Sequence, residues 1–295
     1  MTTPKEIVRV AALGDLHYPK LPQEVLQGLL TQATEQADVL LLCGDLTDYG
    51  EPDEAQRLAQ ACITYAKIPT LGVLGNHDYQ SGQHEEVWKI LCDAGIIMID
   101  GDACEIRGIV FAGVKGFGGG FGQWALQPWG EAITKQFVHE AVNEAVELES
   151  ALAKLRTPQC IVVLHYSPIR DTVVGEPPEI FAFLGSSRLE EPLNRYAVTA
   201  VFHGHAHHGT PKGQTTGGSG LQCRSAATPQ DVSRSPAVSP GRDSGDAAVG
   251  GETCHVYRKP RDWKHWPHRF AAVYSARYMP HGPKPCRGRV RRRHA

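Results

Sequence analysis

The chain has 295 residues, a formal net charge of −2 and eight cysteines. This length can bury one sizeable hydrophobic core or two small ones. Residues 1–220 carry 15 Lys and Arg against 27 Asp and Glu, which argues against a nucleic-acid-binding surface in that range. No apolar run approaches the roughly 18 residues that a membrane span needs, so a membrane-embedded protein is excluded as a class.

The cysteines and the N-terminus point to a reducing compartment. The cysteines form no C-x-x-C pair and no zinc-finger spacing. The opening stretch MTTPKEIVRVAAL has no long apolar segment of the kind found in signal peptides. Cys43 and Cys160 lie in apolar runs, where a buried free thiol is expected. A reducing cytoplasm fits these observations.

Strand and helix patterns alternate from residue 7 to about residue 206. Short apolar runs predict buried strands, and the amphipathic stretches between them predict helices. The predicted strands are 7–13, 39–44, 70–75, a meander over 96–99, 104–107 and 109–114, then 160–165 and 197–205. The predicted helices are 22–37, 51–66 and 135–155. This alternation is typical of a layered α/β protein whose sheets are covered on both faces.

Five short strings of histidine and aspartate follow apolar runs in this order: GDLHYP at 14–19, GDLTD at 44–48, GNHD at 75–78, LHYSP at 164–168 and GHAHH at 204–208. Taken singly, each has an ordinary explanation as a turn aspartate, a helix cap or a satisfied core histidine. Taken together, they place oxygen and nitrogen donors at the carboxyl ends of strands, where ligand sites of open α/β sheets lie. Donors of this kind and number suit two divalent cations side by side.

The five strings resemble the ordered motifs D-x-H, G-D-x-x-D, G-N-H-[DE], H and G-H-x-H of the calcineurin-like metallophosphoesterase superfamily. The resemblance covers residues 14–208, about two-thirds of the chain. It implies an α/β fold, a four-layer α/β/β/α sandwich of two mixed sheets. In the protein Ser/Thr phosphatase branch an arginine follows the second aspartate, whereas this chain has Tyr49. That difference favours the bacterial-type phosphodiesterase or small-phosphatase branch.

The resemblance also implies a set of metal ligands. Asp15, His17 and His207 would bind one metal, Asn76, His165 and His205 the other, and Asp45 would bridge both. Only two of these ligands are carboxylates, so four positive charges on the metals would be incompletely neutralised. The surplus would attract a phosphate and lower the pKa of a bridging water toward neutrality. With no thiolate among the ligands, Mn, Fe and Zn all fit.

The implied reaction is attack on phosphorus by a metal-bridging hydroxide. His77 would face the leaving-group oxygen as a general acid or hydrogen-bond donor. Asp48 is placed to orient His77 and to favour its protonated form. Asp78 is the second candidate for that role, with a supporting or helix-capping acid as the alternative. The Gly-rich string GFGGGFG at 116–122 is expected to border the cleft as a flexible loop.

We therefore expect a binuclear metal-dependent phosphoesterase acting on small phosphoesters, either phosphodiesters or nucleotide-like compounds. A nuclease of the same superfamily is one alternative, but the acidic charge of the catalytic part counts against nucleic acid as a partner. A non-catalytic scaffold is another alternative, but the ligand set and His77 are all retained. The physiological substrate, the preference for mono- or diesters and the oligomeric state are not readable from the sequence.

The character of the chain changes near residue 218. Residues 221–295 carry 15 Lys and Arg against 5 Asp and Glu, and the stretch 223–253 shows no sustained period. We expect a catalytic domain over 1–218 and an irregular basic tail over 219–295, in which only 270–278 has a strand pattern. Two hypotheses explain the tail: sequence read in a shifted frame, or a basic disordered segment that contacts nucleic acid or an acidic partner.

Overall fold

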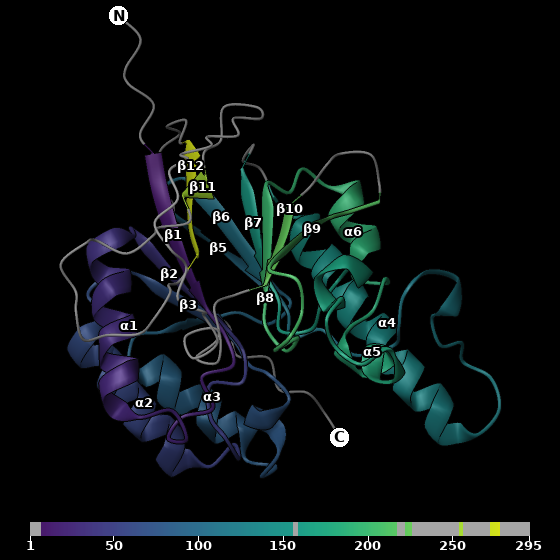
Figure 1. Ribbon diagram of the computed structural model, residues 1–295, viewed down its shortest axis with the longest axis horizontal. Helices are drawn as coiled ribbons and strands as arrows, with labels where there is room; N and C mark the ends of the chain where they lie inside the picture. The colour runs from purple at the N-terminus through teal and green to yellow at the C-terminus, as the bar shows by residue number, and fades with distance from the viewer. Residues whose placement is uncertain (1–6, 156–158, 217–221, 226–253, 256–271, 278–295) are drawn as a thin grey trace, which may run out of the picture.

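Two sheets packed face to face form the centre of the molecule (Figure 1). The computed structural model describes residues 7–155, 159–216, 222–225, 254–255 and 272–277. Within these ranges each sheet has six strands, and helices cover the outer face of each sheet. The layer order α/β/β/α confirms the predicted fold class.

The first sheet carries the first three sequence motifs. Its strands in spatial order are β11 (Cys254–His255), β12 (Ala272–Arg277), β1 (Ile7–Leu13), β2 (Val39–Cys43), β3 (Thr70–Val73) and β4 (Ile97–Met98). Strands β1 to β4 are parallel neighbours, whereas β12 runs antiparallel to β1. The covering helices are α1 (Gln23–Gln36), α2 (Pro52–Tyr65) and α3 (His84–Asp93), each between two consecutive parallel strands.

The second sheet carries the last two motifs. Its order is β5 (Asp102–Ile106), β6 (Ile109–Gly113), β7 (Cys160–Val163), β8 (Ala200–His203), β10 (Gln222–Ser225) and β9 (Lys212–Gln214). The neighbours β6, β7, β8 and β10 are parallel, and the two edge strands are antiparallel. The long helix α4 (Ala132–Leu152) and the short helix α6 (Glu190–Arg195) pack on the outer face.

Alternation along the strands divides the apolar side chains among three cores. In β2, Leu40 and Leu42 face the helices α1 to α3, while Leu41 faces the second sheet. In β7, Ile161 faces the first sheet and Val162 faces α4. Both faces of each strand are covered, so the strands are continuous apolar runs in the sequence. These runs are the pattern from which the strands were predicted.

Shorter elements lie in the connections. The 3₁₀ turns are η1 (His77–Tyr79), η2 (Gly122–Trp124), η3 (Arg170–Val173) and η4 (Pro178–Ile180), and a one-turn helix α5 spans Phe181–Leu184. Helix α2 begins with Pro52 in its first turn and with a reciprocal capping box between Glu51 and Glu54. Both features favour the start of a helix at this position. The connections after the strands shape the site described below.

Three segments beyond residue 218 form strands, and two of them, Gln222–Ser225 and Cys254–His255, differ from the expectation of an irregular tail. Gln222–Ser225 pairs in parallel with β8, Cys254–His255 pairs with β12, and Ala272–Arg277 pairs with β1. Strand pairing rests on main-chain hydrogen bonds, so a short segment without an apolar run can still pair. The strand pattern at 270–278 is confirmed. The rest of 219–295 lies outside the described residues, so the domain division at residue 218 stays a prediction.

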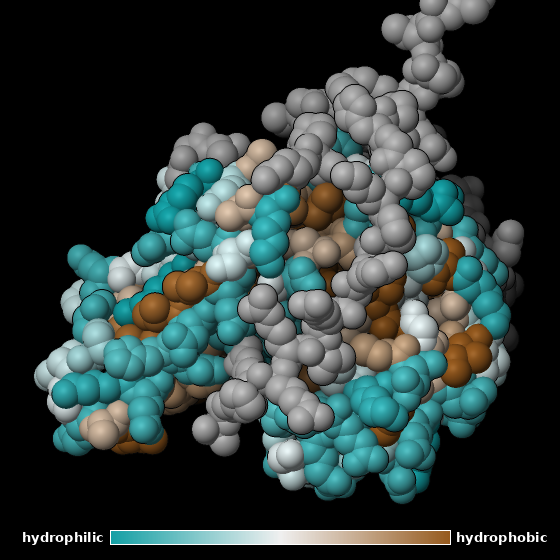
Figure 2. All heavy atoms as spheres, turned by 180° about the vertical axis from the view of Figure 1, so that it is seen from behind, coloured by the Kyte–Doolittle hydropathy of each residue, from teal (hydrophilic) through white to brown (hydrophobic). Residues whose placement is uncertain are grey.

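In the reverse view, hydrophilic side chains cover most of the described surface, and hydrophobic ones show in patches between them (Figure 2). Among the described residues, no helix combines the length and apolar character needed to cross a membrane.

The inter-sheet core makes a direct test of the layer arrangement. Phe111 on β6 is fully buried between the sheets. Replacing Phe111 with Ala should lower the free energy of unfolding by about 3–5 kcal/mol, because the cavity cannot collapse fully. Urea unfolding followed by circular dichroism measures this. The control Val146→Ala, on the exposed side of α4, should change it by less than about 0.5 kcal/mol. Equal losses would contradict the placement of the core.

Candidate metal centre

The chemistry-bearing residues lie just past the carboxyl ends of five strands. Asp15, Asp45, His165 and His205 each stand two residues after the ends of β1, β2, β7 and β8, and Asn76 stands three after β3. These parallel strands end at the same edge of the two packed sheets, so five segments distant in sequence converge there. The first sheet supplies three of the segments and the second sheet supplies two.

The backbone at this edge is strained. Five non-glycine residues among those described have positive φ, and four belong to this cluster: Asp15 (54°), His17 (43°), Asp45 (50°) and His205 (70°), the fifth being Arg107. A left-handed conformation costs an L-residue roughly 1–2 kcal/mol. Such strain concentrates at functional sites, where the surrounding structure maintains it. The sequence gives no sign of this strain.

Gly44 and Gly75, which precede Asp45 and Asn76, allow the loops to approach closely. A Cβ on Gly75 would lie 2.2 Å from both the main-chain nitrogen and Oδ1 of Asp45. A Cβ on Gly44 would lie 2.5 Å from Nδ1 of His165, and Gly44 also has a φ of 81°. The glycines of the G-D and G-N-H strings are thus needed for packing around the site.

Asp15, His17 and His207 form the first group of metal-ligating side chains, with ligand atoms within 4.8 Å of one another. Nε2 of His207 lies 3.4 Å from Oδ1 of Asp15. Burial would raise the pKa of Asp15, but the hydrogen bond from His207 and nearby histidine charges lower it to about 2. Burial and the neighbouring His77 lower the pKa of His17 to about 4. A carboxylate and a neutral imidazole are the forms that bind metals.

His17 provides the test of whether a metal fits this group. Both of its ring nitrogens are buried and have no hydrogen-bond partner. A buried polar atom without a partner costs roughly 1–3 kcal/mol. A cation bound to one of these nitrogens would supply the missing interaction, so the residues present fit a metal.

The second group consists of Asp45, His165 and His205, again with ligand atoms within 4.8 Å. Nδ1 of His165 lies 2.9 Å from the carbonyl oxygen of Cys43, so it carries the proton and donates. Nε2 then presents a lone pair toward Oδ1 of Asn76 at 2.9 Å and Oδ1 of Asp45 at 3.3 Å. Three electron-rich atoms facing one another favour a cation between them.

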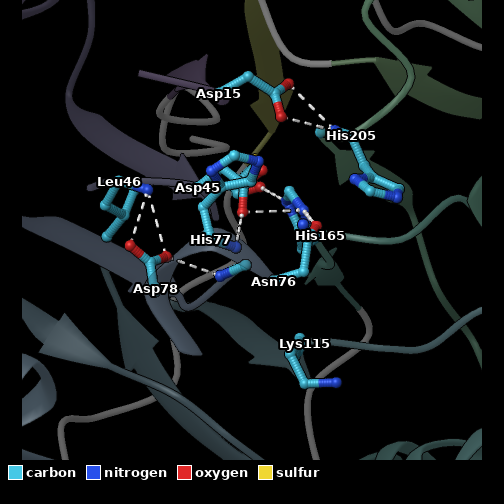
Figure 3. Close-up of polar contacts among 12 residues, drawn as sticks. Asp15, Asp45, Leu46, Asn76, His77, Asp78, Lys115, His165 and His205 are labelled. Carbon is cyan, nitrogen blue, oxygen red and sulfur yellow. Dashed lines mark hydrogen bonds and ion pairs between the residues drawn. The ribbon is translucent and has the colours of Figure 1, made fainter. Parts of the chain in front are cut away.

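His205 is oriented for the same group from the other side. Its Nε2 lies 3.0 Å from the carbonyl oxygen of Phe183, which leaves Nδ1 free to bind a metal. Its main-chain N–H donates to both carboxylate oxygens of Asp15, as Figure 3 shows. Sequence reasoning missed Phe183, because a main-chain carbonyl leaves no signature in the side-chain pattern.

Asp45 stands at the centre of the cluster. It contributes to the second group and to a third, made with His17 and His77. Burial, followed by the negative charges of Asp15 and Asp78, raises the pKa of Asp45 well above its usual value. Because burial and neighbouring carboxylates disfavour the ionised form, a cation beside Asp45 would stabilise its carboxylate, which has histidines on two sides (Figure 3).

His77 lies against this cluster. Its main-chain N–H donates to Oδ1 of Asp45 at 2.8 Å, and its ring packs edge-on against His17, with centroids 4.4 Å apart. Nδ1 lies 2.7 Å from the main-chain carbonyl oxygen of Asp48, to which it donates. The contact predicted between Asp48 and His77 therefore runs through the main chain. The carboxylate of Asp48 instead lies 3.5 Å from Nδ1 of His17.

Asp78 has a supporting role, the alternative that the sequence left open. Its carboxylate is fully buried and accepts hydrogen bonds from the main-chain N–H groups of Leu46, Thr47 and Gly75 and from the hydroxyl of Thr47 (Figure 3). It joins the loop after β2 to the loop after β3. It therefore fixes the position of Asp45 relative to Asn76.

Two further sequence features are the Gly-rich string at 116–122 and Tyr49. The Gly-rich loop at 116–122 packs against the segment around α5, since Gly119 and Gly120 donate to the carbonyl oxygens of Ala182 and Gly185. The side chain of Tyr49 is 57% exposed, and its main-chain N–H donates to Glu54.

The chain has distant likenesses among solved structures, while none of the curated proteins matches it. Two of these structures each share 15% sequence identity with the chain. TT1561 of Thermus thermophilus aligns with a TM-score of 0.47, over 75% of this chain and 89% of that one. GAP50, the anchor in the inner membrane complex of Plasmodium, aligns with a TM-score of 0.39, over 74% of this chain and 71% of that one.

The sequence profile of one family matches residues 8–209, a range that spans most of the chain and contains all five motifs. The chain belongs to the calcineurin-like phosphoesterase family.

Proposed function

We propose that this protein is a binuclear metal-dependent phosphohydrolase. The observation that carries the proposal is the pair of donor groups, Asp15 with His17 and His207, and Asp45 with His165 and His205, which meet at one strand edge. Asn76 adds a neutral oxygen donor beside His165. Asp45 would be the ligand shared by the two metals, because a carboxylate can offer one oxygen to each of them.

The metals, of which Mn, Fe and Zn all suit this donor set, would polarise the phosphoryl oxygens and supply a nucleophilic water at neutral pH. The protein contributes the arrangement around them. The Cys43 and Phe183 carbonyls fix the proton positions of His165 and His205. Asp78 holds together the two loops that carry Asp45 and Asn76.

His77 is placed for the leaving group. Its Nδ1–H donates to the Asp48 carbonyl, so Nε2 is the nitrogen available to a substrate. A protonated Nε2 would donate to the departing ester oxygen as its bond to phosphorus breaks. The Asp48 carboxylate, close to His17, is assigned to orienting that ligand.

The substrate is proposed to be a small phosphoester, with phosphodiesters and nucleotide-like compounds as the first candidates. Tyr49 supports this, since an exposed aromatic ring replaces the arginine of the protein phosphatase branch. The acidic balance of residues 1–220 counts against a nuclease. Cys43, Cys62, Cys92, Cys104 and Cys160 are free thiols, which agrees with the proposed cytoplasmic location.

Hydrolysis of chromogenic esters tests the proposal. Mn²⁺-loaded protein should release p-nitrophenol from bis(p-nitrophenyl) phosphate or p-nitrophenyl phosphate, and a chelator should abolish the reaction. Asp45→Ala should lose both turnover and bound metal, because the shared ligand is gone. The matched control Asp93→Ala, at an exposed position of α3, should keep both. A folded, metal-loaded protein that hydrolyses neither ester would refute the enzyme assignment.

A second test separates the leaving-group role of His77 from metal binding. His77→Ala should lower kcat by about 10²–10⁴-fold with metal content unchanged. The loss should be larger for phenyl than for p-nitrophenyl esters, because the more basic phenolate depends more on the donated proton. His139→Ala, on the exposed side of α4, is the control. Equal losses for both leaving groups would rule out proton donation by His77.

A third test concerns Asp48. Asp48→Asn keeps the main-chain carbonyl beside His77 but removes the charge beside His17. Mn²⁺ affinity should fall by roughly 10–100-fold, as for other groups that orient metal ligands. The ratio of activity on phenyl and p-nitrophenyl esters should stay unchanged. Calorimetry measures the Mn²⁺ affinity. If the affinity is unchanged but the ratio of activity on phenyl and p-nitrophenyl esters changes, the Asp48 carboxylate acts on His77 instead.

A further inference from the structure

A buried ion pair lies beside the candidate metal centre but outside its ligand set. Lys115 lies just after β6, and Glu144 lies on α4. The exposed fraction of Lys115 is 8%, and that of Glu144 is 1%. Nζ of Lys115 lies 3.2 Å from Oε1 of Glu144 and donates a 2.7 Å hydrogen bond to the carbonyl oxygen of Gly116. Removing two charges from water costs several kcal/mol per ion, so stability alone is a weak reason for such a pair.

The pair fixes the turn at residues 115–116. Oε2 of Glu144 accepts a 2.9 Å hydrogen bond from the main-chain N–H of Gly116. The carbonyl oxygen of Lys115 in turn accepts from the main-chain N–H groups of His165, at 3.0 Å, and Tyr166, at 3.1 Å. The position of this turn therefore sets the position of the His165 main chain.

The ammonium group of Lys115 also lies near aromatic rings. Its Nζ is 4.9 Å from the ring centroid of Phe117 and 5.4 Å from that of Tyr166, within cation–π range. The Tyr166 ring packs against His205, with centroids 4.4 Å apart, and against His165 at 5.3 Å. In Figure 3 the side chain of Lys115 extends away from Asp45. Lys115 thus reaches the histidines of the second group through Tyr166 and the main chain.

We propose that the Lys115–Glu144 pair is a positioning device for one half of the metal centre. It orients His165 and His205, the histidines of the second donor group, because the contacts described above lead to these two residues. We expect the first group, Asp15 with His17 and His207, to keep its metal affinity without the pair. This inference rests on the proposed function, because it requires that both donor groups bind metal.

Mn²⁺ titration calorimetry on metal-free protein tests whether the pair affects the second donor group and leaves the first unaffected. In a His207→Ala background, which leaves the second group intact, adding Glu144→Gln should weaken Mn²⁺ binding by roughly 10–100-fold. In a His205→Ala background, which leaves the first group intact, the same change should alter affinity by less than about twofold, within the scatter expected of independent sites. Lys115→Met should reproduce both results.

The control is Glu149→Gln. Glu149 also lies on α4 and pairs with Arg195, but the side chains of that pair are 35% and 58% exposed, whereas Lys115 and Glu144 are buried. The Glu149→Gln substitution should leave Mn²⁺ binding unchanged in both backgrounds. Thermal unfolding of each variant checks that it is folded. If the single variants do not fold, Lys115→Met combined with Glu144→Met replaces the pair with apolar side chains, which proteins often tolerate.

The possible outcomes distinguish a failure of the inference from a failure of the proposed function. Equal weakening of both donor groups would show that the pair only stabilises the fold, and would overturn the inference. Unchanged binding in both backgrounds would overturn it as well, while leaving the binuclear site intact. If the unsubstituted protein binds no Mn²⁺, the proposed function itself fails and the inference fails with it.

Discussion

The crowding of carboxylates and imidazoles at one edge of two packed sheets is the constraint on which the rest of the structure depends. Asp15 and Asp45 are both buried, and the lone pair of His165 points toward Asp45. Without compensating positive charge, this arrangement raises the pKa of Asp45 and leaves both nitrogens of His17 unpartnered. Cations at this edge would stabilise the ionised carboxylates and would bind one of the ring nitrogens of His17.

The fold maintains this arrangement because rigid elements hold every ligand. Parallel strands covered on both faces fix the points from which the loops start, and the left-handed residues and adjoining glycines turn the side chains inward. Asp78 ties together the loops of the first sheet, and the amide of His205 ties the second sheet to Asp15. The backbone strain at the site is offset by the packing of three apolar cores around it.

Much of the fold was predictable from sequence, because buried strands read as apolar runs and the ligands stand at fixed distances after them. Contacts made by main-chain atoms were not predictable. The Phe183 carbonyl that orients His205, and the Asp48 carbonyl beside His77, depend on loop geometry that no residue pattern encodes. The same holds for the strand Gln222–Ser225, whose pairing needs no apolar run. Glu144 was hidden because one acidic residue inside a long helix reads as a surface position.

The central claim is that Asp45 is shared by two metal ions. The most direct measurement is anomalous X-ray scattering from crystals grown with Mn²⁺. We predict two anomalous peaks about 3.5–4 Å apart, one beside Asp15, His17 and His207, the other beside Asn76, His165 and His205, with Asp45 between them. A single peak remote from Asp45, or no peak at saturating Mn²⁺, would contradict it.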